Sequence, residues 1–355
     1  AVFSGSWHDM GRQAGFAFAH QIMSFGQLFG WAVNLFKPAG AWSTQEYYDT
    51  IADRLPQSYR DHLEGLADGL TEALPRLSRD EAWSVILMLN MGTEVLNMKN
   101  MSPIPPLPEL VGCTGFAVTS PAGTFLCHNT DAQSQSSGVA IIYWNPDSGY
   151  RYMTIDPPGW ADVGFGLNEK GIAVTTNAGN PNDNATSGLP PNIMLRRVME
   201  EADSLETAVG LFQKWVDNNT FGTGGALVHL SDFNQNTIAK IQIRSRSIQV
   251  TYGMKQQDGN AIYVGSANHY TSDFYSRPGY VYESSFARYD RLMELLETNT
   301  GDFDLERCWT VLQDTNGGEA TNNTISRIAE DASQSKTVFS TIFTPEGMYY
   351  SLLAP

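Results

Sequence analysis

The stretch ELVGCTGFAVTSPAGTFLCHNTDAQ, residues 109–133, contains two runs rich in β-branched, aromatic and small residues around Ser-Pro-Ala-Gly. Such runs on either side of a turn sequence are typical of a β-hairpin. In an antiparallel hairpin the start of the first strand lies beside the end of the second. We therefore expect the thiol of Cys113 and the carboxylate of Asp131 to lie within reach of each other.

The composition indicates a globular protein with an ample core. Of the 355 residues, 42% are hydrophobic and only 17% are charged, which allows one large domain or two ordinary ones. The net charge of −16 argues against nucleic acid or an anionic membrane surface as a partner. No run approaches the roughly 18 consecutive apolar residues of a membrane span. The chain begins AVFSGSW, without Met, and we expect a processed N-terminus and a secreted or periplasmic rather than cytoplasmic location.

The three cysteines are Cys113, Cys127 and Cys308, which are too few and too scattered for a disulfide framework. They show no Cys-x-x-Cys spacing, so we expect no structural zinc site, and no motif indicates a cofactor. Cys127 and Cys308 fit core positions. His229 and His269 are interpreted as structural, and strand alternation would turn His128 away from Cys127 and Asn129.

The order of local patterns divides the chain in two. Residues 1–98 read as helical, with a capping box at Ser43 and Glu46 and a third helix capped near Ser78. A proline-rich run at 102–109 ends this part. Strands, a helix pair, further strands, a second helix pair and a last hairpin follow. We predict an α+β fold with four αββα layers, in which residues 1–112 form a helical N-terminal segment and 113–355 the core.

The position of Cys113 after Gly112 suggests a particular kind of nucleophile. A thiol with its ordinary pKa of about 8.5 is weakly ionised at neutral pH and needs a base. Cleavage of the Gly112–Cys113 bond would supply one, because the freed α-amine has a pKa of about 7.7–8.0. Asp131 would orient that amine and stabilise its charged form.

These residues resemble a known family. Gly112-Cys113-Thr114 and Asn129-Thr130-Asp131 are similar to the nucleophile region of the N-terminal-nucleophile (Ntn) hydrolases of the acyl-CoA:isopenicillin N (6-aminopenicillanic acid) acyltransferase group, relatives of the penicillin V acylases and bile salt hydrolases. Further segments resemble that group in the same order: GSWHDMGRQAG at 5–15, VGFGLNEKGIAVTTNAG at 163–179, LPPNIMLRRVMEEADSLETAVGLF at 189–212, VGSANHY at 264–270 and SSFARYDRLMELL at 284–296.

The resemblance implies roles for individual residues. Cys113 would be the nucleophile, Asp131 would orient its amine, and the side chain of Asn268 with the N–H or amide of Asn177 would hold an oxyanion. Ser340 would support the site. An arginine just after the nucleophile, which the bile salt hydrolases use, has no evident counterpart, and this argues against a charge-anchored, bile-salt-like substrate.

Two hypotheses from different classes follow. In the first, the chain is a self-processing zymogen whose two fragments stay associated and whose Cys113 cleaves or transfers the acyl group of a small-molecule, non-peptide amide or acyl-amine through a thioester. In the second, it is a non-catalytic binding or scaffold protein with the same fold. Cys113 would then be a buried hydrophobe, and Asp131, Asn177 and Asn268 would cap turns. A papain-like hydrolase is disfavoured, because no partner histidine motif is recognisable. The sequence leaves the oligomeric state open.

Overall fold

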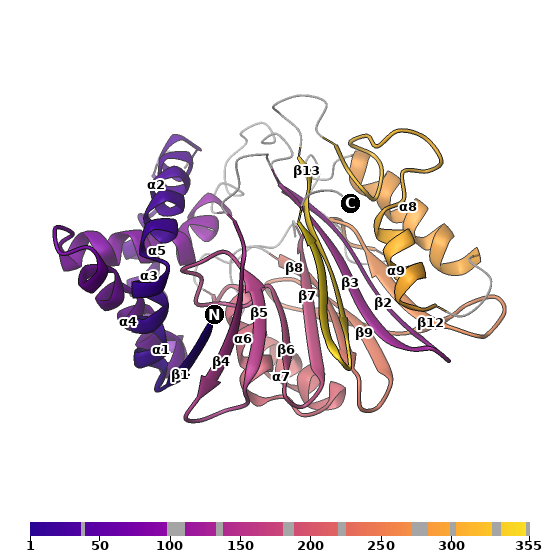
Figure 1. Cartoon of the computed structure of the whole chain (residues 1–355), viewed down its shortest axis with the longest axis horizontal. Coiled ribbons are helices and arrows are strands. Elements are labelled where there is room, and N and C mark those ends of the chain that lie inside the picture. The colour runs from indigo at the N-terminus through magenta and orange to yellow at the C-terminus, as the bar shows by residue number, and fades with distance from the viewer. Residues whose placement is uncertain are drawn as a thin grey trace.

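Two β-sheets lie face to face at the centre of the molecule, and helices cover their outer faces (Figure 1). This computed structural model describes residues 1–36, 40–97, 111–132, 138–179, 188–218, 225–271, 283–298, 303–328 and 335–352. The predicted α+β fold with four αββα layers is confirmed. The proline-rich run at 102–109 lies outside the described residues.

The predicted hairpin forms the middle of the smaller, six-stranded sheet. Strand β2 (Val111–Ser120) pairs antiparallel with β3 (Gly123–Ala132), so that Gly112 lies opposite Asp131 and Cys113 lies opposite Thr130. Gly123 begins β3 at φ +137°, a backbone conformation that favours glycine. The sheet order is β11-β12-β2-β3-β13-β14, and the other strands are β11 (Met254–Lys255), β12 (Ile262–Ser266), β13 (Lys336–Thr344) and β14 (Gly347–Leu352).

The larger sheet has eight strands in the order β1-β4-β5-β6-β7-β8-β9-β10. They are β1 (Val2–Gly5), β4 (Ala140–Pro146), β5 (Tyr152–Asp156), β6 (Phe165–Asn168), β7 (Ile172–Gly179), β8 (Gly225–Asp232), β9 (Thr237–Ile243) and β10 (Ile248–Tyr252). The N-terminal segment is therefore not purely helical, because β1 pairs in parallel with β4 and extends the sheet of the core. Phe3 explains this placement, since it is buried and packs on Trp144 with ring centroids 5.6 Å apart.

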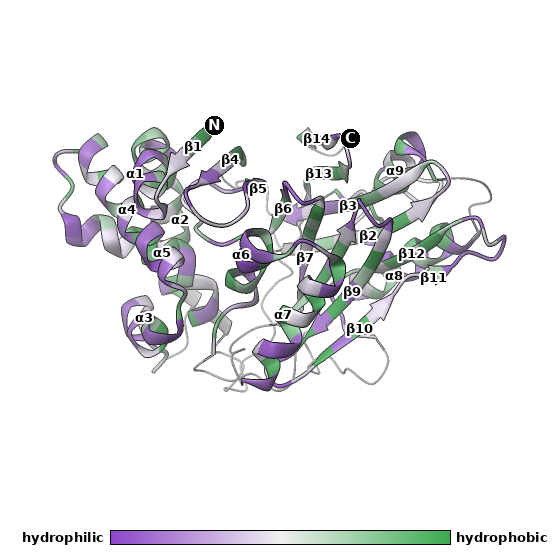
Figure 2. Cartoon of the chain, turned by 90° about the horizontal axis from the view of Figure 1, so that it is seen from below, coloured by the Kyte–Doolittle hydropathy of each residue, from purple (hydrophilic) through white to green (hydrophobic). Residues whose placement is uncertain are grey.

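Two helix pairs form the outer layers (Figure 2). Helices α6 (Pro191–Glu201) and α7 (Leu205–Asp217) cover the larger sheet, and Ser204 caps α7. Helices α8 (Glu283–Thr298) and α9 (Leu305–Leu312) cover the smaller sheet. Between the sheets, apolar side chains such as Leu126, Phe165 and Phe343 form a third cluster. The core therefore consists of three buried layers, and the strand ends that carry the site lie among them.

The N-terminal helices gather at the β1–β4 end of the larger sheet (Figure 1). They are α1 (Trp7–Ala17), α2 (Ala19–Phe36), α3 (Thr44–Ile51), the 3₁₀ turn η1 (Ala52–Arg54), α4 (Gln57–Ala73) and α5 (Arg79–Asn97). The predicted capping box at Ser43 is present. Helices α1 and α4 approach closely, since a Cβ on Gly15 would lie 2.2 Å from the backbone oxygen of Leu66. Within the described residues, no helix combines the length and apolar character that crossing a membrane requires.

Candidate active site

Cys113 lies at the start of β2, next to the ends of two other strands. Its side chain is 8% exposed and belongs to none of the three apolar clusters. The peptide N–H of Ala178 near the end of β7 and the carboxamide of Asn268 just after β12 lie close enough to the sulfur to lower the pKa of its thiol. The backbone N–H of Cys113 donates to Oδ1 of Asn268 at 2.8 Å. Polar groups from both sheets therefore surround Cys113.

The orientation of the Asn268 carboxamide follows from its partners. Arg288 on α8 can only donate, and its Nη2 lies 3.0 Å from Oδ1 of Asn268. The amide nitrogen must then be the atom that faces away from the guanidinium, and it donates to the backbone oxygen of Ala178 at 3.1 Å. The same nitrogen faces the sulfur of Cys113. Asn268 therefore accepts from the backbone nitrogen of Cys113 and donates towards its sulfur.

Asp131 lies opposite Gly112 on the face of the hairpin that meets the helices, whereas Cys113 lies opposite Thr130 and its side chain is on the other face. The thiol and the carboxylate therefore do not face each other as the sequence predicts, because one residue of register separates them. The carboxylate of Asp131 is fully buried and accepts from Oγ1 of Thr337 at 2.9 Å and from Nη1 of Arg327 at 3.2 Å. Arg288, also fully buried, lies 3.9 Å from it. The guanidinium groups of Arg288 and Arg327 favour negative charge that develops on nearby atoms.

Arg288 connects Asp131 to the nucleophile. Its Nη1 donates to the backbone oxygen of Cys113 and, at 3.0 Å, to Oγ1 of Thr114. It therefore fixes the peptide group that follows Cys113, while Asn268 fixes the nitrogen that precedes its Cα. Asp131 and Asn268, predicted as site residues, are brought to the same backbone segment as Cys113.

In the intact chain the thiol is neutral at physiological pH. Burial, and after it the nearby charge of Asp131, raise the pKa of Cys113 to about 12. Arg288 and the two donors from Ala178 and Asn268 act in the opposite direction. The sulfur is therefore a latent nucleophile that needs a base close by.

Asn177 lies next to this cluster, but its carboxamide is engaged elsewhere. Its Nδ2 donates to the backbone oxygens of Ser266 at 3.1 Å and Ala267 at 2.7 Å. The donor that faces Cys113 from this strand is instead the N–H of Ala178. Strand alternation explains the difference, because the side chain of Asn177 enters the space between the sheets while the neighbouring peptide group faces the sulfur.

Other residues named from the sequence have structural contacts. Ser340 donates from Oγ to Oδ1 of Asn129 at 2.6 Å, and Asn129 in turn donates to the backbone oxygens of Leu312 and Ile325. Ser340 thus supports the strand that carries Asp131 rather than the sulfur itself. Cys127 and Cys308 are fully buried in the layer between the smaller sheet and its helices, as expected of core residues.

Several site residues were missed at the sequence level. Arg288 had a signal, because it follows the spacing of the buried stripe of α8 formed by Ser285, Leu292 and Leu296. A charged residue on such a stripe indicates a buried ion pair or a functional site. Arg327 lies in an irregular segment between α9 and β13, where no local pattern marks it. Among the described residues, no three His, Cys, Asp or Glu side chains gather in a way that could hold a metal ion.

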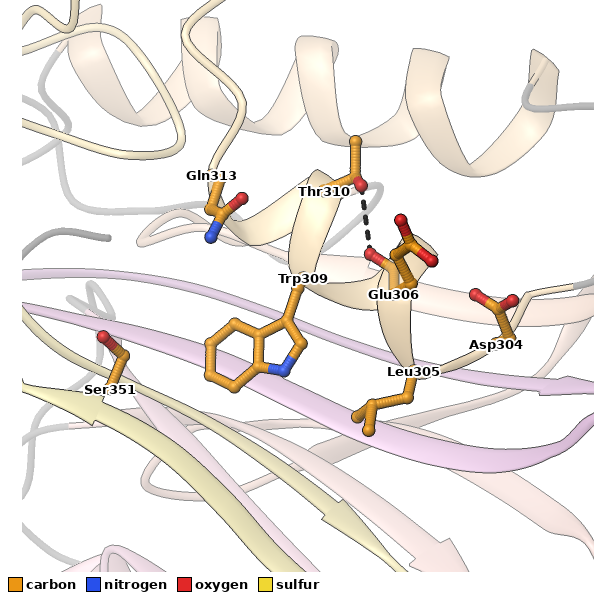
Figure 3. Close-up of a pocket in the computed structure, with 7 residues that line it drawn as sticks. All are labelled: Asp304, Leu305, Glu306, Trp309, Thr310, Gln313 and Ser351. Atoms are coloured by element: carbon orange, nitrogen blue, oxygen red, sulfur yellow. Dashed lines mark hydrogen bonds between the residues drawn. The ribbon is translucent and has the colours of Figure 1, made fainter.

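A surface cavity of about 750 Å³ lies between α9 and β14 (Figure 3). The indole of Trp309 forms one side of it and extends towards Ser351 (Figure 3). Its other lining residues are Asp304, Leu305, Glu306, Thr310 and Gln313. This set shares no residue with the Cys113 cluster, so the cavity is a feature of the outer helix layer.

Comparison with known proteins identifies the family. A sequence model of the acyl-coenzyme A:6-aminopenicillanic acid acyl-transferases matches residues 118–354. The chain belongs to this family. The match begins just after Cys113 and includes Asp131, Asn177 and Asn268, and the family expected from the hairpin motifs is confirmed.

Individual relatives of this acyl-transferase family member are distant. An uncharacterized protein of Archaeoglobus fulgidus is 24% identical over 283 residues, which are 71% of this chain and 46% of the relative. The chain thus spans about half the length of that curated protein. Among solved structures, a Caenorhabditis elegans ortholog of N-acylethanolamine-hydrolyzing acid amidase has a TM-score of 0.43 at 14% identity, over 67% of this chain and 99% of that one. A conjugated bile acid hydrolase of Clostridium perfringens has a TM-score of 0.47 at 12% identity, over 68% and 89%.

Proposed function

We propose that the chain is a self-processing amidohydrolase or acyltransferase that acts on the C–N bond of a small-molecule amide through a thioester on Cys113. The observation that carries this proposal is the position of Asn268, whose carboxamide bonds both the backbone nitrogen of Cys113 at 2.8 Å and the backbone oxygen of Ala178 at 3.1 Å, beside a cysteine that directly follows a glycine. Membership of an acyl-transferase family supports an enzyme over the scaffold alternative.

Self-processing converts the precursor into a chain with an N-terminal cysteine. The sulfur of Cys113 attacks the carbonyl carbon of Gly112, the C–S bond forms, and the C–N bond between the two residues breaks. The thiol proton ends on the departing nitrogen. Water then hydrolyses the thioester, which leaves a carboxylate on Gly112 and both a free thiol and an α-amine on Cys113. Asn268 and Arg288 support this step, because they hold the backbone on either side of the Cα of Cys113.

In the processed protein the freed amine is the general base. Its ordinary pKa of about 7.7–8.0 allows it to take the thiol proton near neutral pH. The sulfur attacks the substrate carbonyl, and the negative oxygen of the tetrahedral intermediate accepts from Asn268 Nδ2 and from the N–H of Ala178. The amine returns its proton to the leaving nitrogen as the C–N bond breaks. Water or a second amine then resolves the thioester.

The two fragments, 1–112 and 113–355, stay associated after cleavage. The pairing of β1 with β4 supports this, since it crosses from one fragment to the other. The apolar cluster of the larger sheet also includes residues of both fragments, such as Met10, Leu66 and Ile193. Dissociation would expose this shared core to water, which costs roughly 25 cal/mol per Å² of apolar surface.

Mass spectrometry of the purified protein tests the proposal. We expect two fragments, the second beginning at Cys113, and acylation of that cysteine alone by a thiol-reactive acyl probe. Cys113→Ala should give one uncut chain without labelling. Cys127→Ala is the matched control and should be cut and labelled as the parent is, because Cys127 lies in the apolar layer away from the site. A soluble chain that turns over amides without being cut would refute self-activation.

A panel of acyl p-nitroanilides of increasing chain length separates the two activities. Release of nitroaniline in buffer alone measures hydrolysis. Acceleration by an added amine, with formation of the new amide, indicates transfer. An uncut, unlabelled protein that turns over none of them would favour the scaffold alternative.

A further inference from the structure

The side chain of Asn177 joins the two segments that carry the donors. It projects from β7 one residue before Ala178, and its Nδ2 donates to the backbone oxygen of Ala267, one residue before Asn268, at 2.7 Å. A second bond of 3.1 Å reaches the backbone oxygen of Ser266 at the end of β12. One carboxamide therefore connects the larger sheet to the smaller sheet at the positions adjacent to both donors. It is fully buried.

His128 on β3 holds that carboxamide in its orientation. Its Nε2 lies 3.0 Å from Oδ1 of Asn177. Because Nδ2 of Asn177 faces two carbonyl oxygens, the atom that faces His128 must be the oxygen, and Nε2 must carry a hydrogen. The other ring nitrogen, Nδ1, then accepts from Oγ1 of Thr130 at 3.2 Å. Burial lowers the pKa of His128 to about 3, so the ring stays neutral, and its bond to Oδ1 of Asn177 fixes the tautomer.

We infer that Asn177 and His128 form a positioning pair that sets the separation of the two oxyanion donors, Ala178 N–H and Asn268 Nδ2, without touching the reacting atoms. The inference rests on the proposed function and changes the role expected for Asn177 from donor to spacer. Donors of an oxyanion act only at hydrogen-bond distance from the developing charge, and a displacement of about 1 Å can cost about 10²-fold in rate.

The residues around Asn177 and His128 are packed so closely that these two side chains have little room to move. A Cβ added to Gly115, two residues after Cys113, would lie 3.0 Å from Oδ1 of Asn177 and 2.7 Å from Cε1 of His229. His229 in turn bonds from Nε2 to Oγ of Ser266 at 2.9 Å. The pair is thus packed directly against the strand that carries the nucleophile, and movement of its members would be transmitted to the donors.

The test compares Asn177→Leu with Thr175→Val in the processed enzyme. Leucine has the shape of asparagine and makes none of its hydrogen bonds. Thr175 lies on the same strand, two residues away and fully buried, but its Oγ1 contacts only His229 among these residues, at 3.4 Å. We expect Asn177→Leu to lower kcat for acyl p-nitroanilides about 10-fold to 10²-fold with KM nearly unchanged. Thr175→Val should leave both constants unchanged.

Variants of His128 provide the conservative rescue. His128→Gln retains an N–H that can reach Asn177, and its kcat should stay within about threefold of the parent value. The kcat of His128→Leu should decrease as much as that of Asn177→Leu. If Asn177→Leu does not fold, the comparison of His128→Gln with His128→Leu tests the inference instead. Equal kcat in Asn177→Leu and Thr175→Val, or a change confined to KM, would overturn the inference.

A second readout does not depend on turnover. Loss of donors to the sulfur raises the pKa of the thiol and slows its alkylation by iodoacetamide at fixed pH. We expect Cys113 to react more slowly in Asn177→Leu than in the parent, as read by mass, and unchanged alkylation would count against the positioning pair. A parent protein that neither cleaves itself nor turns over amides would refute the proposed function. The alkylation rates of parent and Asn177→Leu would still test whether Asn177 positions the two donors.

Discussion

Replacement of Asn268 by aspartate exchanges one atom of the site. The acceptor oxygen that faces Cys113 N–H and Arg288 is retained, and its new charge is compensated by the guanidinium 3.0 Å away. The donor that faces the sulfur is lost, and an oxygen now lies near the backbone oxygen of Ala178, where the amide nitrogen had donated at 3.1 Å. The fold should therefore survive, since the ion pair with Arg288 replaces a neutral hydrogen bond.

The expected effect on rate follows from the lost donor. Removal of a single oxyanion donor costs about 10²–10³ in kcat, or roughly 2.7–4 kcal/mol. The carboxylate adds to this, because its negative charge raises the pKa of the neighbouring thiol and repels the oxyanion. About 10²-fold is therefore a lower limit for Asn268→Asp.

Comparison with Asn268→Ala separates chemistry from packing. Alanine loses all the hydrogen bonds of the side chain, so a packing role would make it the more damaging change. If the donor is what matters, aspartate should be at least as inactive as alanine while melting at a higher temperature. The assays are the rate of self-cleavage by intact mass, turnover of acyl p-nitroanilides and thermal unfolding. An aspartate variant that cleaves itself and turns over amides within tenfold of the parent would refute the assignment of Asn268.

Three further predictions concern the surroundings of the site. Gly115→Ala would place a Cβ 2.7 Å from His229. We expect the free energy of unfolding in urea to decrease by about 1–3 kcal/mol and amide turnover to decrease with it. An unchanged free energy of unfolding would contradict the close approach. Arg288→Lys retains the charge but not the two contacts that the guanidinium makes to Cys113 and Asn268, so amide turnover should decrease at least about tenfold. Arg288→Met also loses the charge, and its turnover should decrease more. Burial lowers the pKa of His128 from 6.5 to about 3; the folded state then binds fewer protons than the unfolded one, and stability should decline as pH falls from about 6.5 towards 3. Urea titrations at pH 7 and pH 4 should show a smaller decline for His128→Gln.

The parts of the fold that could be predicted are those determined by local pattern. The hairpin at β2–β3 was visible because a turn and two short runs specify a register on their own. The helix starts at Ser43 and Ser78 were visible because capping depends on residues within one turn. By contrast, the pairing of β1 with β4 joins residues more than a hundred positions apart, and four residues of strand at the N-terminus gave no alternation to read.

The residues of the site also fall into those that local pattern predicts and those that depend on distant parts of the chain. Cys113 and Asp131 share one hairpin, so the approach of their backbone segments was predictable, but the register that places Asp131 opposite Gly112 and not opposite Cys113 was not. Arg327 reaches Asp131 from a segment 196 positions away, a meeting that depends on how α9 and β13 pack. The distinction between Asn177 and Ala178 depends on which way one peptide group faces within a paired strand. Residue type does not indicate the direction of a peptide N–H, since every residue except proline carries the same N–H.

The high pKa of Cys113 in the intact chain keeps its thiol unreactive towards substrates until cleavage supplies a base. A thiol with a pKa of about 12 is almost entirely protonated at pH 7, so the folded precursor does not carry a reactive thiolate. Cleavage replaces the neutral amide nitrogen of Cys113 with an amine that is partly protonated near neutral pH, and this cation lies within a few bonds of the sulfur. A positive charge at that separation, added to Arg288 in a buried site, lowers the pKa of the thiol, and the uncharged fraction of the amine accepts the proton. The burial that suppresses the thiolate before cleavage therefore strengthens its coupling to the amine afterwards.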